Sequence, residues 1–306
     1  MGVEKFVDPE KTIQGKPRAV VPLTDLKTLW INTGTRCNLQ CENCYIESTP
    51  TNDSLEYITS KQVQTYLDEI YQLNLQTKEI GLTGGEPFLN PNLIKIITLC
   101  LERNFNLLIL TNGYKVIDRY KDQLQFLNSQ YHNQLNLRFS LDHYSLEVHE
   151  KERGSGTFHP TLRNIKWFAE QGFNISIAGR SLIHEKMATA LHGYGAILKE
   201  YNIELDVNNT AKLTIFPEMT LAKDVPEIST ECWSILKKSP RDIMCSSSRM
   251  VVKRKGEENP KVLSCTLLAY DKRFELGSTL KESLRHVSLN HRYCSEFCVL
   301  GGASCN

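Results

Sequence analysis

Short apolar runs alternate with longer amphipathic segments over the first two thirds of the chain. The short runs are typical of buried strands, and apolar residues that recur every three or four positions predict helices with one face on the core. The predicted strands are residues 29–32, 79–84, 107–111, 135–142, 173–179 and 203–208. The predicted helices are residues 59–73, 91–104, 117–128, 161–171 and 185–199.

This alternation predicts an α/β fold with a parallel sheet, because right-handed crossovers through helices bring successive strands side by side in one direction. Polar and glycine-rich segments follow the strand ends, which is where α/β barrels place their chemistry. We expect residues 25–215 to form a partial (β/α)6 barrel of the TIM type, preceded by an N-terminal extension over residues 1–24.

The pattern changes after residue 215. Pro217 and Pro226 interrupt it, and a helix is predicted over residues 229–238. A β-branched run then leads through a turn at residues 256–260 into Val-Leu-Ser-Cys, which predicts a hairpin. Residues 216–306 are therefore expected to form a small α+β domain.

The charge of the chain is balanced, with 36 Lys and Arg against 35 Asp and Glu and a net charge of +1. This balance gives no electrostatic basis for binding nucleic acid or an anionic membrane. The N-terminus lacks the apolar core of a signal peptide, and no apolar run is long enough to span a bilayer. We therefore expect a cytoplasmic protein with no nucleic-acid or membrane partner.

Ten cysteines are many for a cytoplasmic chain, because disulfides rarely persist there. Eight of them fall into two groups. The first group is Cys37, Cys41 and Cys44, and the second is Cys245, Cys265, Cys294, Cys298 and Cys305. Clustered thiols in a reducing compartment favour metal or iron–sulfur ligation.

The first group, Cys37-x3-Cys41-x2-Cys44, lies in a loop after the first predicted strand and is followed by Tyr45. Three thiolates suit a soft metal centre. On a [4Fe–4S] cluster they leave one iron open to a non-protein ligand, whereas a zinc site would need a fourth ligand. The pattern resembles the CxxxCxxC signature of the radical S-adenosylmethionine (SAM) family.

That resemblance implies a particular chemistry. In the family, the amine and carboxylate of SAM chelate the open iron, and the reduced cluster cleaves SAM to a 5′-deoxyadenosyl radical that abstracts hydrogen from a substrate. The electron would come from an external one-electron reductant such as a flavodoxin or a ferredoxin.

Segments at other predicted strand ends strengthen the resemblance. Residues 84–87 are similar to the family's GGEP segment, residues 111–113 to its TNG segment, and residues 175–179 to the strand that packs on adenine. Glu86 would then accept from the SAM amine, while Ser140 and Asp142 would hold ribose hydroxyls or the SAM carboxylate. The implied SAM contacts are Gly84, Gly85, Glu86, Thr111, Asn112, Ser140, Asp142, Gly179 and Arg180.

Simpler roles stay open for several of these residues. The glycines and Pro87 could only form a tight turn, residues 111–113 could only join a strand to a helix, and Asp142 could only cap a backbone. Arg153 and Arg163 are alternatives to Arg180 as the partner of the SAM carboxylate.

The second cysteine group resembles the SPASM and twitch domains that follow the core in many radical SAM enzymes. There a hairpin carries cysteines at its ends, a short helical stretch follows (here residues 276–284), and a close cysteine group comes last. Five cysteines are fewer than two auxiliary clusters need, so the resemblance implies one auxiliary [4Fe–4S] cluster, with zinc as an alternative. The preferred ligands are Cys245, Cys265, Cys294 and Cys298, and Cys305 could replace one of them.

The resemblance leaves the substrate undetermined. Only about 27 residues precede the first predicted strand, and no additional peptide-binding domain is evident there. We therefore expect a small-molecule substrate in preference to a ribosomal peptide. A non-catalytic, cysteine-rich metal-binding scaffold is the alternative from a different class, and the Gly-Gly-Glu-Pro segment argues against it.

Overall fold

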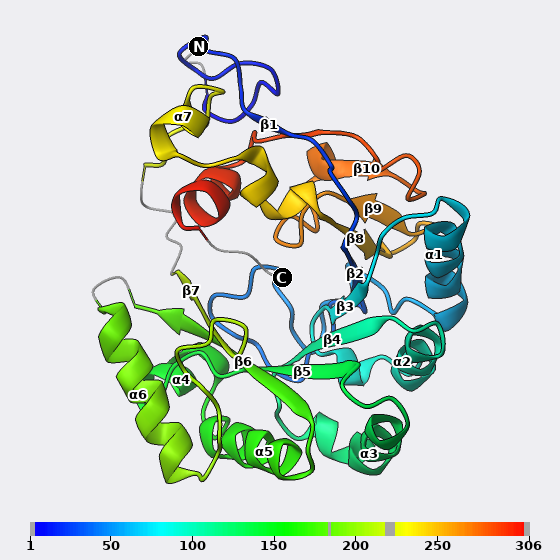
Figure 1. Cartoon of the computed structure of the whole chain (residues 1–306), viewed down its shortest axis with the longest axis vertical. Helices are drawn as coiled ribbons and strands as arrows, with labels where there is room; N and C mark the ends of the chain where they lie inside the picture. The colour runs from blue at the N-terminus through cyan, green and yellow to red at the C-terminus, as the bar shows by residue number, and fades with distance from the viewer. Residues whose placement is uncertain (1–3, 183–184, 218–223, 303–306) are drawn as a thin grey trace.

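The computed structural model describes residues 4–182, 185–217 and 224–302. These residues build one sheet in the order β10-β9-β8-β2-β3-β4-β5-β6-β7, and a short pair, β1 with β11 (Figure 1). The strands are β1 (Val20–Val21), β2 (Thr28–Asn32), β3 (Glu79–Thr83), β4 (Asn106–Thr111), β5 (Leu135–Ser140), β6 (Asn174–Ser181), β7 (Leu213–Pro217), β8 (Ser248–Val252), β9 (Lys261–Leu263), β10 (Glu275–Gly277) and β11 (Val287–Ser288).

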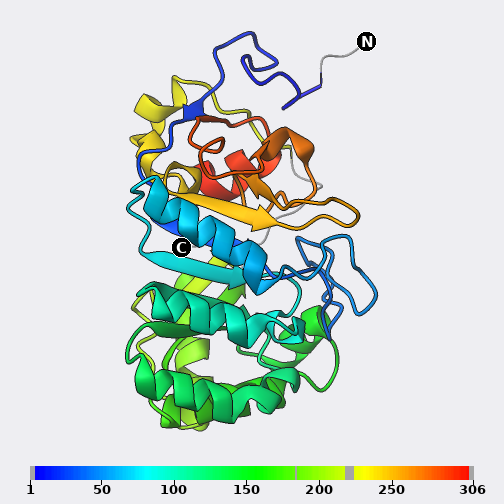
Figure 2. The ribbon, with the colours of Figure 1, turned by 90° about the vertical axis from the view of Figure 1, so that its right-hand side faces the viewer.

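Helices cover the outer side of this sheet, and Figure 2 shows α1 and α2 stacked side by side along it. The α-helices are α1 (Ser60–Gln72), α2 (Leu93–Glu102), α3 (Lys121–Gln130), α4 (Leu146–Arg153), α5 (Phe158–Glu170), α6 (Met187–Glu200) and α7 (Cys232–Leu236). The shorter helical turns are η1 (Pro87–Leu89), η2 (Val116–Tyr120), η3 (Pro240–Asp242), η4 (Met244–Ser246), η5 (Lys272–Phe274) and the π-helical η6 (Cys294–Leu300).

The predicted α/β fold with a parallel, partial barrel is confirmed. Strands β2 to β7 are all parallel, and among the described residues the sheet stays open, with β10 and β7 at its edges. Local sequence explains much of this order. Helix α1, for example, begins with a capping box between Thr59 and Gln62 and buries Val63, Leu67 and Ile70 on one face.

The sixth strand was predicted in the wrong place. Residues 203–208 form turns and irregular structure, and the strand that pairs with β6 is β7. Pro217, which the sequence pattern marked as an interruption, is the last residue of this strand. An edge strand tolerates proline because one side of its backbone needs no ladder partner.

Two further differences concern helices. The sequence pattern missed α4, whose weakly amphipathic run LEVHEKER offers only a capping serine, Ser145, as a signal. Residues 276–284, expected to be helical, instead contain the end of β10 followed by turns. Gly277 has a positive φ of 133° there, a conformation that interrupts any helix.

The predicted C-terminal hairpin is confirmed, and it extends the main sheet. Strands β8 and β9 pair antiparallel, while β8 pairs parallel with β2 from the first part of the chain. One continuous sheet therefore crosses the predicted domain boundary between residues 215 and 216.

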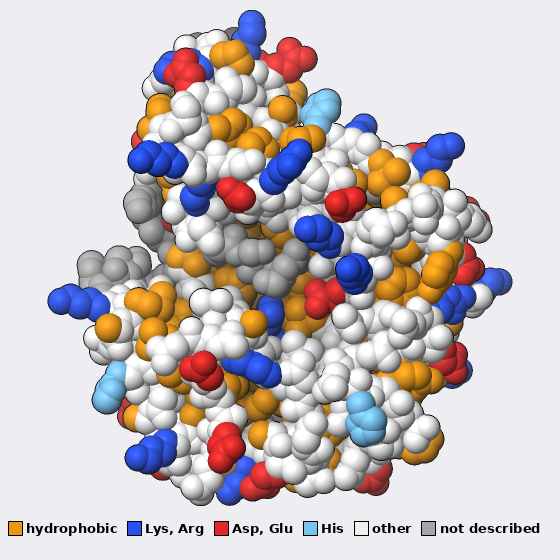
Figure 3. Space-filling model, viewed as in Figure 1, with side chains coloured by type: hydrophobic (Ala, Val, Ile, Leu, Met, Phe, Trp, Pro, Cys, Tyr) orange, Lys and Arg blue, Asp and Glu red, His pale blue; other side chains and the backbone are white. Residues whose placement is uncertain are grey.

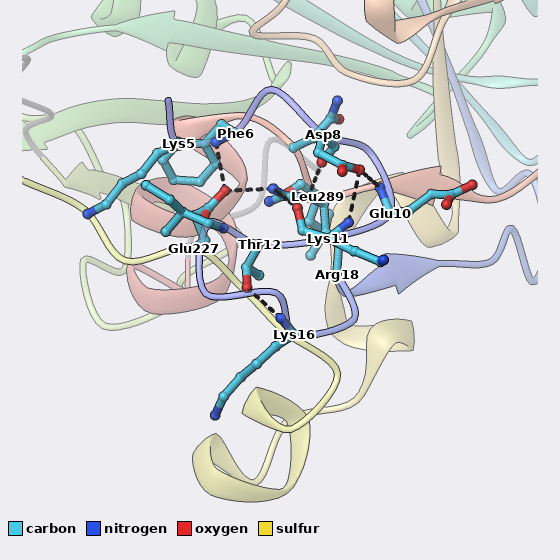
Figure 4. Close-up of polar contacts among 12 residues, drawn as sticks. Lys5, Phe6, Asp8, Glu10, Lys11, Thr12, Lys16, Arg18, Glu227 and Leu289 are labelled. Carbon is cyan, nitrogen blue, oxygen red and sulfur yellow. Dashed lines mark hydrogen bonds and ion pairs between the residues drawn. The ribbon is translucent and has the colours of Figure 1, made fainter. Parts of the chain in front are cut away.

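The N-terminal segment packs on the C-terminal part of the chain through a buried ion pair (Figure 4). Arg18 and Glu227 lie 2.6 Å apart, with side chains only 1% and 4% exposed. The other polar groups around the pair are backbone atoms: Arg18 donates to the carbonyls of Asp8, Lys11 and Leu289, and Glu227 accepts from the N–H groups of Phe6 and Ile13. No helix among the described residues combines the length and apolar character that a membrane span requires.

Removing one member of this pair is expected to destabilise the protein strongly. Arg18→Met would leave the Glu227 carboxylate buried without its charge partner, which costs about 3–5 kcal/mol of unfolding free energy. Lys16→Met is the control, because Lys16 pairs with Glu231 in an exposed ion pair, which solvent screens and which contributes little to stability. Urea unfolding measures both changes, and equal small losses would contradict the expectation.

The same pair predicts a pH dependence. Burial would raise the pKa of Glu227, but hydrogen bonds from Ile13 N–H, Arg18 and Phe6 N–H lower it below the ordinary value of 4.5. A lowered folded-state pKa means that the stabilisation is present above pH 4.5 and is lost as the pH falls through the folded-state value. We expect the unfolding free energy of the Glu227→Gln variant to change less than that of the unchanged chain between about pH 5 and pH 3.

Candidate active site

A cleft of about 1250 Å³, including space open to solvent, lies at the carboxyl ends of the parallel strands. Figure 3 shows one face of the molecule, on which apolar, basic and acidic side chains lie between its upper and lower parts. Of the SAM contacts and first-group cysteines predicted from the sequence, the cleft brings together Cys37, Cys41, Cys44, Gly84, Gly85, Thr111, Asn112, Ser140, Asp142, Gly179 and Arg180.

Glu86 is the predicted SAM contact that does not line the cleft. Its carboxylate is 2% exposed and accepts hydrogen bonds from Phe88 N–H, the Thr111 hydroxyl and Asn112 N–H at 3.2, 3.0 and 2.9 Å. Burial raises the pKa of Glu86 to about 7, against these hydrogen bonds, which lower it. The carboxylate therefore ties the end of β4 to the turn after β3.

The two glycines before Glu86 allow the backbones of neighbouring loops to touch. A Cβ atom at Gly85 would lie 2.2 Å from the carbonyl oxygen of Arg36, and one at Gly84 would lie 2.6 Å from that of Gly34. Gly84 also has a φ of 143°, which side chains rarely adopt. These glycines bring the turn after β3 against the loop that leads into Cys37.

Asp142 is held by two arginines. Arg153 donates to both carboxylate oxygens at 2.8 and 3.1 Å, and Arg180 lies 3.5 Å away. Burial would raise the pKa of Asp142, but the two guanidinium groups lower it below its ordinary value. Arg180 also donates to the Asn43 carbonyl and lies over the Tyr45 ring, 5.2 Å from its centre. Strand β6 thus contacts the cysteine loop directly.

Of the three candidate arginines, Arg153 and Arg180 line the cleft and Arg163 does not. Arg163 is exposed on α5. The glycine at 179 has a packing role as well, since a Cβ there would lie 2.1 Å from the hydroxyl of Tyr194, which donates to the carbonyls of Leu141 and Asp142.

Sequence reasoning missed several cleft residues. Arg138 lies in β5 at a position that alternates with Asn136 and Ser140, and a charged residue on this polar face of the strand was a signal that could have found it. Phe216, Thr266, Leu267 and Phe297 come from later in the chain, and nothing in their local sequence marks them.

A second hollow, with about 450 Å³ of empty space that includes space open to solvent, is lined by Cys245, Cys265, Cys294 and Cys298 together. Cys245 precedes β8, Cys265 follows β9, and the other two lie on η6. Burial raises the pKa of Cys245 to about 11 and that of Cys294 to about 12. At neutral pH these values favour the neutral thiol, and a positive charge nearby would favour the thiolate. Cys305 lies outside the described residues.

The two cavities share a wall. Thr266, Leu267 and Phe297 line both the strand-end cleft and the four-cysteine cavity. Phe297 also stacks on Phe216 of β7, with ring centres 5.7 Å apart. The C-terminal part of the chain therefore closes one side of the cleft.

The described cysteines of each group line a cavity. Among the described residues, no group of three or more His, Cys, Asp or Glu side chains is arranged to hold one ion. A [4Fe–4S] cluster takes each thiolate on a different iron, so that its ligands line a space instead of meeting at one point.

The family model of the radical SAM superfamily matches residues 31–187, which is more than half of the chain. The match contains the three-cysteine loop and the ends of strands β2 to β6. The chain therefore belongs to the radical SAM superfamily, a family of enzymes, and this membership implies SAM and a [4Fe–4S] cluster.

Three known proteins illustrate the similarity. The bacteriocin subtilosin biosynthesis protein AlbA of Bacillus subtilis is 32% identical over 55% of this chain and 37% of its own length. The mycofactocin maturase MftC of Mycobacterium tuberculosis is 25% identical over 53% of this chain and 41% of its own. Streptococcus suis SuiB, solved with its precursor peptide SuiA, is 13% identical with a TM-score of 0.56 over 87% of this chain and 64% of its own.

Two facts follow from these comparisons. The matches span less than half the length of the two curated relatives. The fold similarity to SuiB, in contrast, extends well beyond residues 31–187 into the rest of the chain.

The expected preference for a small-molecule substrate is wrong. AlbA is a bacteriocin biosynthesis protein, MftC is a maturase, and SuiB was solved with a precursor peptide. The expectation relied on the short segment before the first predicted strand, which carries no information about the lining of the cleft.

Glu86→Gln is expected to destabilise the fold. Whichever way the amide is turned, its nitrogen faces a backbone N–H, either that of Phe88 or that of Asn112, and one buried donor loses its acceptor. The loss should be about 1–3 kcal/mol of unfolding free energy. Glu102→Gln on the exposed side of α2 is the control, and urea unfolding of both variants checks the difference. A Glu86→Gln variant as stable as the control would show that these hydrogen bonds contribute little.

Proposed function

We propose that this chain is a radical SAM maturase that modifies a peptide and carries one auxiliary iron–sulfur cluster. The observation that carries the proposal is the shared wall between the three-cysteine cleft and the four-cysteine cavity. It puts two cysteine groups, far apart in sequence, on either side of Thr266, Leu267 and Phe297. Similarity to AlbA, MftC and SuiB supports the choice of a peptide.

Cys37, Cys41 and Cys44 would hold the first cluster through three of its irons. With SAM bound at the open iron, this centre supplies a 5′-deoxyadenosyl radical, the oxidising agent of the family's chemistry. The chain's own contribution is to orient SAM and to keep water away from the reacting atoms.

The SAM-binding positions follow from the cleft lining. Ser140 at the end of β5 is half-buried and offers a hydroxyl, and Gly179 of the paired strand β6 lines the cleft beside it. Arg180 remains partly exposed to the cleft and is the guanidinium we assign to the SAM carboxylate. Arg153 already gives two hydrogen bonds to Asp142, and so we assign it to holding that carboxylate.

The peptide would enter on the side of the cleft formed by the C-terminal part. Phe216, Leu267 and Phe297 make that wall apolar, which suits an apolar side chain of a peptide and excludes water from a radical. Cys245, Cys265, Cys294 and Cys298 would hold the auxiliary cluster directly behind this wall. Four thiolates leave none of its irons open, which favours electron transfer over direct binding of the peptide.

Iron content tests the two-cluster proposal. Anaerobic reconstitution should give about eight irons per chain, and a Cys294→Ala/Cys298→Ala double variant about four. Cys100→Ala is the matched control, because Cys100 is buried in the core on α2 and lines neither cavity. About four irons in the unchanged chain, with no loss in the double variant, would contradict the proposal of an auxiliary cluster.

Peptide modification is tested with precursor peptides encoded beside the gene. Dithionite-reduced protein with SAM should release 5′-deoxyadenosine, and a deuterated peptide should pass deuterium into it. Cys41→Ala should abolish both signals, because two thiolates no longer hold the cluster, while Cys100→Ala should keep them. Deuterium transfer from small metabolites but from no peptide would overturn the maturase proposal.

A further inference from the structure

The side chain of Asn112 is held at each of its polar atoms. Its carbonyl oxygen accepts from the backbone N–H of Tyr114 at 2.8 Å. Its amide nitrogen donates to Asn38 Oδ1 at 2.9 Å and lies 3.6 Å from the sulfur of Cys37. The residue is only 6% exposed, so that water competes little for these hydrogen bonds.

The orientation of this amide is set by its neighbours. A backbone N–H such as that of Tyr114 can only donate, and so the atom that faces it must be the oxygen of Asn112. The reversed amide would place two donors against each other and would turn its oxygen toward the Cys37 sulfur. The amide nitrogen of Asn112 is therefore the atom that faces Cys37.

The backbone of Asn112 is fixed as firmly as its side chain. Its N–H donates to Glu86, and its carbonyl accepts from the hydroxyl of Thr161 at 3.2 Å. Glu86 and Thr161 are themselves buried. The side-chain amide is thus held beside Cys37 by Tyr114 and Asn38, and Glu86 and Thr161 anchor the backbone of the same residue.

The three cysteines of the loop are not equivalent in this respect. Cys37 accepts from the Leu39 backbone N–H at 3.4 Å as well as from Asn112, and Cys44 accepts from the Ser48 backbone N–H at 3.3 Å. Among the described residues, Asn112 is the one side chain that donates to a sulfur of this loop. It is therefore the donor that a substitution can remove.

We propose that Asn112 is a positioning residue that raises the reduction potential of the cluster on Cys37, Cys41 and Cys44. The inference rests on the proposed function, because it requires these thiolates to hold a cluster. Reduction adds one electron and makes the sulfur ligands more negative. A hydrogen bond from the Asn112 amide stabilises the more negative state more strongly, and reduction becomes easier.

This role differs from the SAM contact that the TNG segment predicts for Asn112. A residue that only contacts SAM would change the affinity for SAM and leave the potential of the SAM-free cluster unchanged. A residue that donates to Cys37 changes that potential before SAM is added. The two roles are therefore separated by a measurement made without SAM.

Asn112→Leu is the main test, since leucine has a similar shape and no N–H group. In a redox titration followed by electron paramagnetic resonance, the SAM-free potential of the first cluster should fall. We expect about a tenfold lower ratio of reduced to oxidised cluster at a fixed potential, which is 59 mV for one electron. The first cluster is recognised as the one whose signal changes when SAM is then added.

Thr161→Val is the matched control. It removes a buried hydrogen bond to the backbone of Asn112 and leaves the amide nitrogen beside Cys37. Its potential should stay at the value of the unchanged chain. If Asn112→Leu leaves the potential at that value too, while SAM binds more weakly, the proposal is overturned.

Asn112→Asp covers the case in which the leucine variant does not assemble a cluster. Aspartate keeps an acceptor for Tyr114 N–H, loses the donor to Cys37 and adds negative charge, so its potential should fall at least as far. An unchanged or higher potential in this variant overturns the inference. An unchanged chain that takes up no iron refutes the proposed function itself, before any variant is compared.

Discussion

The buried carboxylate of Glu86 connects the parts of the site that the chain brings from separate strands. It accepts from the turn that follows β3 and from Thr111 and Asn112 at the end of β4. Because its three partners are all donors inside the protein, the carboxylate cannot move without leaving a buried group unpaired. Asn112 in turn reaches Cys37 and Asn38, and the position of the cysteine loop is linked in this way to two strand ends.

A second carboxylate performs the same task at the end of the strand that neighbours β4. Asp142 at the end of β5 binds Arg153 from α4 and lies beside Arg180 from β6. Arg180 continues to the cysteine loop through the Asn43 carbonyl and the ring of Tyr45. Two buried acids, one after β3 and one after β5, therefore connect one polar loop to the sheet through Asn112 and Arg180.

The C-terminal part completes the cleft because it belongs to the same sheet. Strand β8 is hydrogen-bonded along β2, and Cys245 before it and Cys265 after β9 line the cavity that shares a wall with the strand-end cleft. The N-terminal segment secures the arrangement from outside, since Arg18 and Glu227 join residues more than two hundred positions apart. The wall between the two cavities, formed by Thr266, Leu267 and Phe297, therefore depends on this packing and cannot be formed by one segment alone.

The sequence by itself determined the parallel α/β fold, five of the strands of the barrel, the hairpin and both cysteine groups. These features rest on local periodicity and on residue types whose chemistry is specific. It misplaced β7, because residues 203–208 have strand-like composition but the pairing with β6 decides which segment is used. Only the tertiary structure decided that Glu86 is enclosed by donors, that Arg153 holds Asp142, and that Phe297 separates the two cavities. Such contacts join residues that are distant in sequence, and the free energy that selects them comes from burial, which no local pattern records.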